Sequence, residues 1–173
     1  VSSHQFDVAE RGFSTRFDGD LDMRMDQKSE ISAKQIINKY EEEKLADVLF
    51  LYGELRSARA LAKTIVEARV EQEIETSFQL KEVLKSHLPK AKEHKILAQI
   101  YQAIRIEVNQ ELEVLKEFLN QIPDLLNEDG RLSVISYHSL EDRLVKRFIR
   151  TGLFTGEPDK NFYGNTNEPL KKV

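Results

Sequence analysis

The sequence predicts an α/β fold that carries a helical insertion, with most of the 173 residues in helices. Three observations lead to this prediction. Apolar side chains recur every three or four positions across residues 32–110, which is the period of an amphipathic helix. Residues 131–137 instead mix β-branched and apolar side chains in a short run after a turn, as buried strands do. The succession of helix, turn, strand and helix between about 93 and 150 is typical of an α/β sheet domain.

Capping and breaking residues divide the helical region. Ser32 and Thr76 are residue types that accept a hydrogen bond at a helix N-terminus, and they predict helices up to residue 39 and over 77–88. Gly53 separates two further predicted helices, 41–52 and 54–70, and Pro89 ends the helix that Thr76 begins. Residues 93–121 carry the strongest pattern and predict one helix of more than six turns.

After this long helix the pattern changes to that of a sheet domain. Residues 127–130 predict a turn, 131–137 a strand and 140–150 a helix, with Ser139 as its N-cap and Asp142 completing a capping box. Residues 1–30 and 152–169 lack a period and read as loops. We therefore expect three regions: a loop segment of the α/β domain at 1–31, an inserted helical domain at 32–110, and a return to the α/β domain at 111–173.

Composition excludes several function classes. Without cysteine the chain cannot form disulfides, thiolate metal sites or a cysteine nucleophile, and its four histidines are far apart in sequence, so we expect no metal. Neither glycine-rich nucleotide-binding motif occurs. The longest apolar run, 48–52, is far too short to span a bilayer, so we expect no membrane partner. The chain opens on Val1 and ends in a turn-like stretch, and we expect it to be a piece of a longer protein.

Two stretches present polar groups in unusual places. Asp22 and Arg24 lie in a loop of alternating charged and apolar residues, where they either form an ion pair that pins the loop or face a ligand. Gln102, Arg105 and Asn109 share one stripe of the long helix. This stripe is either solvated or holds the loop 21–26 or a substrate.

A third stretch follows the predicted strand, where ligands collect in open α/β sheets. It contains His138, Ser139, Glu141, Asp142 and Arg143. Adjacent side chains on a turn point apart, which argues against a Ser-His hydrolase. Two basic clusters are further candidates for phosphate contacts, although most such runs are solvated faces: Lys81, Lys85, Lys90, Lys92 and Lys95, and Arg143, Lys146, Arg147 and Arg150.

Taken in order, these stretches resemble the bacterial MraW/RsmH family. The chain opens with Val1-Ser2-Ser3-His4-Gln5 and continues with the hexapeptide LDMRMD at 21–26. The long helix carries QAIRIxVNxEL at 102–112, and HSLEDR follows at 138–143. The resemblance covers about residues 1–150, and two six-residue identities are hard to reach together by chance.

The resemblance implies a Rossmann-like class I methyltransferase domain interrupted by a helical insertion that helps to recognise substrate. The family transfers a methyl group from S-adenosylmethionine to the N4 amine of a cytidine in 16S ribosomal RNA of the small subunit, in the cytoplasm. The glutamine of the opening motif contacts the cofactor in this family, and here it is Gln5. The family's glycine-rich cofactor loop would lie upstream, so we expect this chain alone to be inactive.

Methyl transfer to the N4 amine requires that the amine is positioned for attack and that a nearby group accepts its proton. No Pro-Pro motif occurs here, so we expect other residues to serve as catalytic groups: Asp22, His138, Glu141 and Asp142. The expected substrate-binding residues are Arg24, Arg105, Asn109, Ser139 and Arg143. The alternative is a non-catalytic helical module that binds RNA or protein. An unpaired strand at 131–137 would favour a homodimer or strand exchange.

Overall fold

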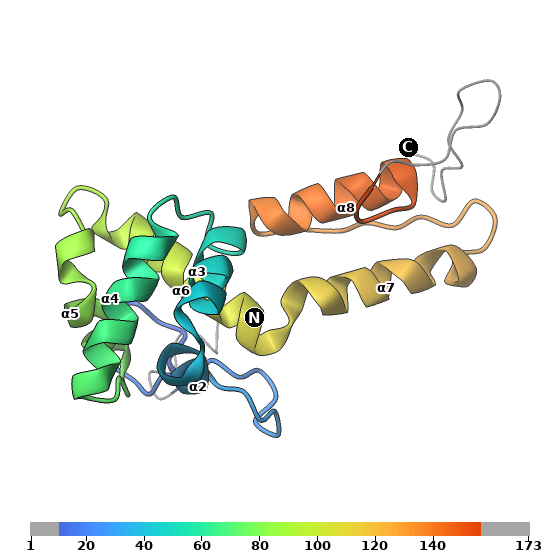
Figure 1. The fold of residues 1–173 in the computed structure, drawn as a ribbon. Helices are drawn as coiled ribbons and strands as arrows, with labels where there is room; N and C mark the ends of the chain where they lie inside the picture. The colour runs from blue at the N-terminus through green and yellow to red at the C-terminus, as the bar shows by residue number, and fades with distance from the viewer. Residues whose placement is uncertain (1–10, 157–173) are drawn as a thin grey trace. The chain divides into compact units, whose positions relative to one another are not determined.

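The computed structural model describes residues 11–156, which form helices joined by turns and loops (Figure 1). The chain divides between Gln110 and Glu111 into two compact units. The prediction of a mostly helical chain is confirmed for these described residues. No helix in this range is long and apolar enough to cross a membrane.

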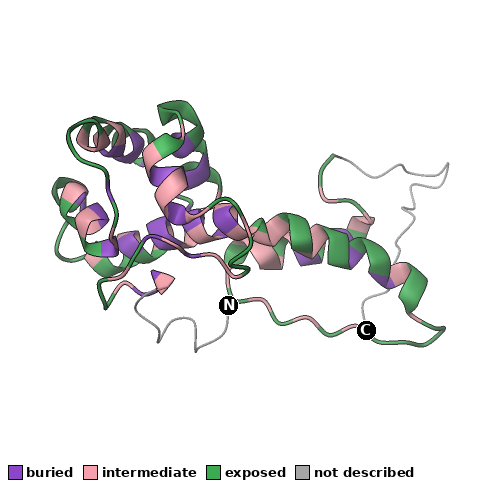
Figure 2. Ribbon diagram, turned by 90° about the horizontal axis from the view of Figure 1, so that it is seen from below, coloured by how far each residue is buried: buried purple, intermediate pink, exposed green. Residues whose placement is uncertain are grey.

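Unit 1 is a helical cluster that shares a single apolar core. α6 packs against α2 and α3, and α4 packs against α3. Buried residues face this core and exposed ones face outward (Figure 2). The elements of the unit are α2 (Ala33–Lys39), α3 (Glu42–Leu51), α4 (Ala58–Glu71), α5 (Ser77–Val83), the short 3-10 helix η2 (Lys85–His87) and α6 (Glu93–Asn109).

Both predicted N-caps of unit 1 are confirmed. Ser32 precedes α2, and its backbone N–H donates to Gln35 Oε1 at 2.9 Å. Thr76 precedes α5, and its hydroxyl accepts from the Gln79 N–H at 3.3 Å. The predicted continuation of α5 to residue 88 is wrong, because α5 ends at Val83 and only η2 follows before Pro89.

The predicted single helix over 93–121 is also wrong. It is two helices, α6 and α7 (Glu111–Leu125), separated by Gln110 in the left-handed conformation at φ 49° and ψ 38°. One left-handed residue stops the helical hydrogen-bond pattern and redirects the chain. The apolar period continues on both sides of this residue, so the period alone does not reveal the break.

Unit 2 has a much smaller core. α7 packs against α8 (Ser139–Thr151). Leu119, Val145 and Phe148 form the buried apolar cluster of this unit, and Ile122 of α7 is buried as well. Phe148 stacks on Phe154 with ring centroids 4.9 Å apart. The predicted turn is present, because Gly130 N–H donates to the Asn127 carbonyl at 2.8 Å.

The predicted strand at 131–137 does not form in the described chain. Alternate residues keep strand-like exposure: Leu132 and Val134 pack on the small core, whereas Ile135 and Tyr137 are 80% and 89% exposed. A strand also needs a neighbour to complete its ladder of hydrogen bonds. Between residues 11 and 156 the only pairing of β type is an isolated bridge from Asp20 to Thr76. The Rossmann-like sheet stays a prediction, as do the domain limits at residues 31 and 110.

Candidate functional site

The loop over residues 11–31 is irregular but packed into unit 1. Phe13, Leu21 and Met23 are buried in the same core as the helices. The loop backbone is bonded at both edges, with Leu21 N–H donating to the Glu75 carbonyl at 2.9 Å and Met23 N–H to the Arg11 carbonyl at 3.0 Å. The loop is therefore held in a fixed position against the helices of unit 1.

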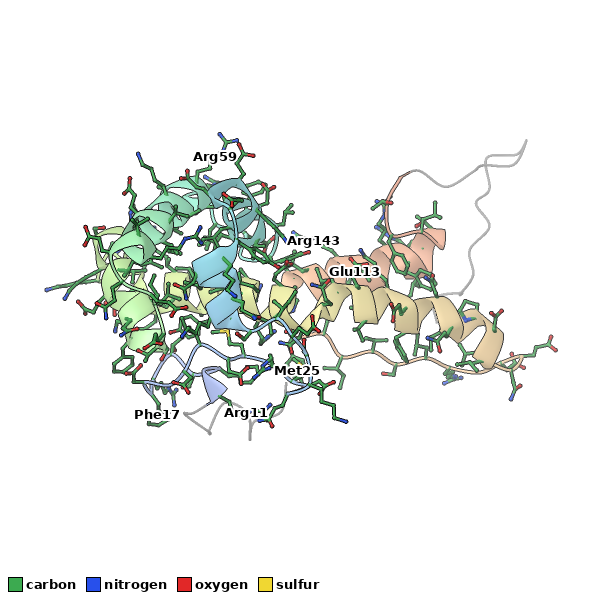
Figure 3. The ribbon with its side chains drawn as sticks, turned by 60° about the horizontal axis from the view of Figure 1, so that its bottom comes forward. Arg11, Phe17, Met25, Arg59, Glu113 and Arg143 are labelled. Carbon is green, nitrogen blue, oxygen red and sulfur yellow. The ribbon has the colours of Figure 1, made fainter. Side chains whose placement is uncertain are left out.

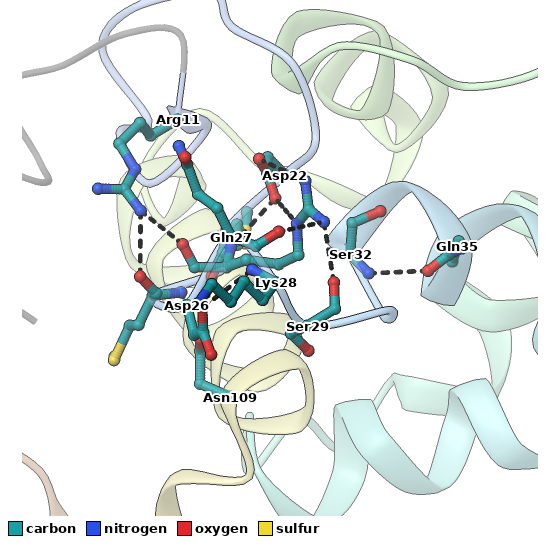
Figure 4. Close-up of polar contacts among 12 residues, drawn as sticks. Arg11, Asp22, Asp26, Gln27, Lys28, Ser29, Ser32, Gln35 and Asn109 are labelled. Atoms are coloured by element: carbon teal, nitrogen blue, oxygen red, sulfur yellow. Dashed lines mark hydrogen bonds and ion pairs between the residues drawn. The ribbon is translucent and has the colours of Figure 1, made fainter.

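Asp22 and Arg24 form the ion pair that the sequence offered as one alternative. Arg24 Nε lies 2.5 Å from Asp22 Oδ1, and Arg24 Nη2 donates to Oδ2 at 3.2 Å (Figure 4). This hydrogen bond is the main cause that raises the pKa of Arg24. Arg24 Nη1 also donates to the carbonyls of Gln27 and Ser29 at 3.2 and 2.9 Å. The pair and these two carbonyl contacts tie the loop together.

Asn109, at the end of α6, holds the same loop. Its Oδ1 accepts from the Met25 N–H at 2.6 Å, and its Nδ2 donates to the carbonyls of Met23 and Arg105 at 2.8 and 2.9 Å (Figure 4). Met23 has a φ of 56°, which is rare and strained for a residue other than glycine. Both amide hydrogens of Asn109 are thus used inside the protein. The geometry favours its loop-holding role over a substrate contact.

Between the start of this loop and α6 lies a pocket of about 470 Å³. This volume is within the range typical of small-ligand sites. Arg105 belongs to its lining, together with loop residues and the preceding turns of α6. Phe17, labelled in Figure 3, is one of the lining residues and is 53% exposed as a whole residue. The lining residues are Phe13, Ser14, Thr15, Arg16, Phe17, Met23, Ala98, Tyr101, Gln102 and Arg105.

Two polar side chains of the pocket are oriented by backbone carbonyls. The Tyr101 hydroxyl donates to the Ser77 carbonyl at 3.1 Å, and burial raises its pKa to about 12, so it stays neutral. Gln102 Nε2 donates to the Tyr52 carbonyl at 2.9 Å. This bond fixes which end of the amide is the acceptor and leaves Oε1 as the group of Gln102 that can receive a hydrogen bond.

The HSLEDR segment lies in unit 2, and its capping differs from the prediction. His138, and not Ser139, is the N-cap of α8: its Nδ1 accepts from the Glu141 N–H at 3.4 Å. Glu141, and not Asp142, is the acidic residue that contacts the backbone at this end of α8: its Oε2 accepts from the N–H of Tyr137, the residue before the cap, at 2.8 Å. An imidazole nitrogen can accept a hydrogen bond from a backbone N–H as a hydroxyl oxygen does. Ser139 was predicted as the N-cap because Ser is a preferred residue type at that position.

Other residues of this segment have surface positions. Ser139 is the first residue of α8, and Arg143 lies exposed on the same helix (Figure 3). Asp142 Oδ2 accepts from Lys146 Nζ at 2.8 Å. The structure also brings together Glu111, His138 and Glu141, with ligand atoms all within 4.8 Å of one another, although no sequence spacing indicated such a group.

The predicted site residues thus fall into two groups. Asp22, Arg24, Arg105 and Asn109 gather in unit 1, and the group from 138 to 143 lies in unit 2. Gln5 lies outside the described residues. Sequence reasoning missed the pocket residues Phe17 and Tyr101. A large aromatic residue in a polar loop, two positions before Gly19, was the available signal for Phe17.

Comparisons with known proteins agree with the motifs. The model of the MraW methylase family matches residues 1–158. Ribosomal RNA small subunit methyltransferase H of Flavobacterium johnsoniae is 63% identical over all 173 residues, and the protein of that name from Christiangramia forsetii is 64% identical. The one from Cytophaga hutchinsonii is 53% identical. The chain spans 57 to 58% of the length of these relatives. The chain belongs to the MraW methylase family.

Proposed function

We propose that this chain is the substrate-binding part of an enzyme that methylates the N4 amine of a cytidine in 16S rRNA of the small ribosomal subunit. The observation that carries the proposal is the pocket between the loop and α6, in a chain that belongs to a methylase family and is similar to rRNA methyltransferases. S-adenosylmethionine supplies the methyl group when bound. We propose that the residues described by the structure bind the RNA substrate.

The pocket has the features that an unstacked base requires. An enzyme that modifies a base must take it out of its stack, at a cost of a few kcal/mol. Stacking on an aromatic side chain returns about 1–3 kcal/mol per base, and Phe17 offers an exposed ring at the pocket. Arg16 and Arg105 add positive charge to the same lining. Single-stranded RNA is recognised in this way, by stacking and by cations.

Gln102 gives the pocket a means to select an amino-bearing base. Its Nε2 is engaged by the Tyr52 carbonyl, so Oε1 is the acceptor presented by this lining residue. The exocyclic N4 amine of cytosine is a donor, whereas uracil carries an acceptor oxygen at that position. We expect Gln102 to accept from N4 and so to prefer cytidine to uridine.

Acceptance of the N4 proton is assigned to the group Asp22, His138, Glu141 and Asp142. Within this group the geometry ranks Asp22 low, because Arg24 contacts both of its carboxylate oxygens. Arg24, Ser139 and Arg143 remain proposed substrate contacts, with Arg24 acting through the loop that it holds.

The test is a chimera in which this sequence replaces the matching segment of the F. johnsoniae relative. We expect it to transfer labelled methyl groups from S-adenosylmethionine to small subunits that lack the modification, giving N4-methylcytidine on nucleoside analysis. Phe17→Ala should lower single-turnover transfer by about tenfold or more, as expected for the loss of one stacked base. His138→Ala and Asp22→Ala then test the proton acceptor, with the larger loss expected for His138→Ala.

A chimera that folds and binds S-adenosylmethionine in calorimetry, yet methylates no small subunit, would contradict the proposal. Binding of RNA without binding of the cofactor would instead favour the non-catalytic module. Exposed Phe50 of α3 provides the matched control, because Phe50→Ala removes a similar ring outside the pocket and should leave transfer unchanged.

A further inference from the structure

The end of α5, the start of α6 and the connection between them carry one of the two basic clusters of the chain. Residues 81–95 hold five Lys against two Glu, whereas the other positions together hold 21 basic and 28 acidic residues. Both glutamates are already neutralised, Glu82 by Lys85 at 3.0 Å and Glu93 by Lys81 at 2.8 Å. A net acidic chain thus carries a local excess of positive charge in this region.

Three of these lysines form no ion pair with any residue described. Lys90, Lys92 and Lys95 are exposed, and they lie within six successive positions of the chain. Like charges this close repel one another, so the arrangement favours a polyanionic partner. We refer to Lys90, Lys92 and Lys95 as the basic turn.

The basic turn is held in place by the core beneath it. Leu84, Leu88 and Leu97 are buried on either side of the turn. His87 Nε2 lies 2.9 Å from the Thr64 hydroxyl of α4, and Lys92 N–H donates to the Pro89 carbonyl at 2.8 Å. The backbone that carries the charges is therefore ordered in advance, which lowers the entropic cost of binding.

Helix α6 connects the basic turn to the pocket. Lys95, Ala98, Gln102 and Arg105 are spaced by three, four and three residues, so they follow one face of α6. Ala98, Gln102 and Arg105 line the pocket. At 1.5 Å per residue, Lys95 lies about 15 Å along the axis from Arg105 and only one turn from Ala98. A strand that enters the pocket can therefore place its neighbouring phosphates on the basic turn.

We propose that the basic turn binds the phosphate backbone of the RNA strand whose target base enters the pocket. This inference rests on the proposed function. It adds the path of the RNA strand, which follows α6 between the basic turn and Arg105. Phosphate contacts position a nucleic acid without reading its sequence. The turn thus supplies affinity and register, and the pocket supplies base selection.

The test compares RNA binding by the chain and by the triple variant Lys90→Gln/Lys92→Gln/Lys95→Gln. The probe is a fluorescein-labelled single-stranded oligoribonucleotide of about 12 nucleotides containing one cytidine, titrated by anisotropy at several salt concentrations. Each phosphate contact contributes about 0.7 to the slope of log affinity against log salt for single strands. The triple variant should therefore bind about tenfold or more weakly at low salt, with a slope shallower by about 2.

The matched control is Lys39→Gln/Lys44→Gln/Lys63→Gln, which removes the same charge from exposed positions of α2, α3 and α4. It should keep the slope. Circular dichroism verifies that all variants fold. Equal affinity and slope for the two triple variants would overturn the basic turn as the contact, and if Phe17→Ala still weakened binding the proposed function would stand. Failure of the unmodified chain to bind the RNA would overturn both.

Discussion

Among the described residues, the loop 11–31 and the segment 131–137 both lack regular secondary structure, but they pack against the rest of their units to different extents. The loop 11–31 buries Phe13, Leu21 and Met23 in the main core and is bonded by Asn109 from α6. The segment 131–137 packs Leu132 and Val134 on a small core and leaves Ile135 and Tyr137 exposed. Irregular backbone can thus be as well determined as a helix when side chains satisfy its polar groups. The pocket of unit 1 depends on this property of the loop.

The largest expected effect is at Gly12, where the loop turns. Its φ is +67°, and a Cβ there would lie 2.0 Å from the Asp20 carbonyl oxygen. We expect Gly12→Ala to lower the free energy of unfolding of unit 1 by about 3–5 kcal/mol, through a strained backbone and a direct clash. Gly156 is the control: its φ is +74° with open space around it, so Gly156→Ala should cost only about 1–2 kcal/mol in urea unfolding. Similar costs at both positions would show that the loop is not tightly fixed.

The next effect is at Asn109, whose side chain makes three hydrogen bonds to backbone groups. Asn109→Ala leaves the Met25 N–H and the Met23 carbonyl without this partner, which should cost about 2–4 kcal/mol. The measurement is urea unfolding with amide exchange at Met25 as a local reporter. Asn120→Ala, at an exposed site on α7, should change the free energy of unfolding little. Unchanged exchange at Met25 in Asn109→Ala would argue against this anchor.

The junction of the loop with α5 should depend on pH. The Phe78 N–H donates to Asp18 Oδ1 at 3.0 Å, and this bond is the main cause that lowers the pKa of Asp18 below its usual 3.8. Because the folded pKa lies below the unfolded one, the contribution to stability is complete above 3.8 and is lost as pH falls through the folded value. Asp18→Asn should reduce the loss of stability between about pH 5 and pH 2, measured by urea unfolding. Asp47→Asn on α3 is the control, and an equal effect there would contradict the assignment.

The smallest effect on stability is expected in the second segment. Ile135 is 80% exposed, so Ile135→Ser should change the free energy of unfolding by less than about 0.5 kcal/mol. Removing this exposed side chain should also weaken any self-association through the segment, which sedimentation would detect. Leu21→Ala, at a fully buried position of the loop, should cost about 2–5 kcal/mol by comparison. A cost at Ile135 as large as that at Leu21 would remove the distinction between the two segments.

Most helices and the two N-caps of unit 1 were predictable because their determinants are local, whereas the N-cap of α8 was not, since His138 and not Ser139 occupies it. Ser32 and Thr76 cap the helices as expected, and the apolar period of residues 32–110 produced the core. The break at Gln110 was not predictable, since the period continues through it. The strand at 131–137 was predicted from a pattern that the structure retains as alternating exposure, but pairing depends on a neighbour that local sequence cannot reveal.

The candidate site was predictable in its motifs and less so in its contacts. LDMRMD and QAIRIxVN identified the residues that meet, and the Asp22–Arg24 pair was one of the alternatives. The pocket required the long-range approach of residues 13–17 to α6, over more than 80 positions of sequence. Residue spacing alone carries no information on such an approach. The roles of these residues in catalysis stay predictions.

Amide hydrogen exchange under native conditions tests most directly whether the loop is fixed while the second segment is not. The amides of Leu21, Met23 and Met25, which donate to Glu75, Arg11 and Asn109, should exchange only with the global unfolding of unit 1. The amides of Ser133 and Ile135 should exchange at nearly the rate of an unstructured peptide. Fast exchange at Met23 and Met25, equal to that at Ile135, would contradict this account of the pocket.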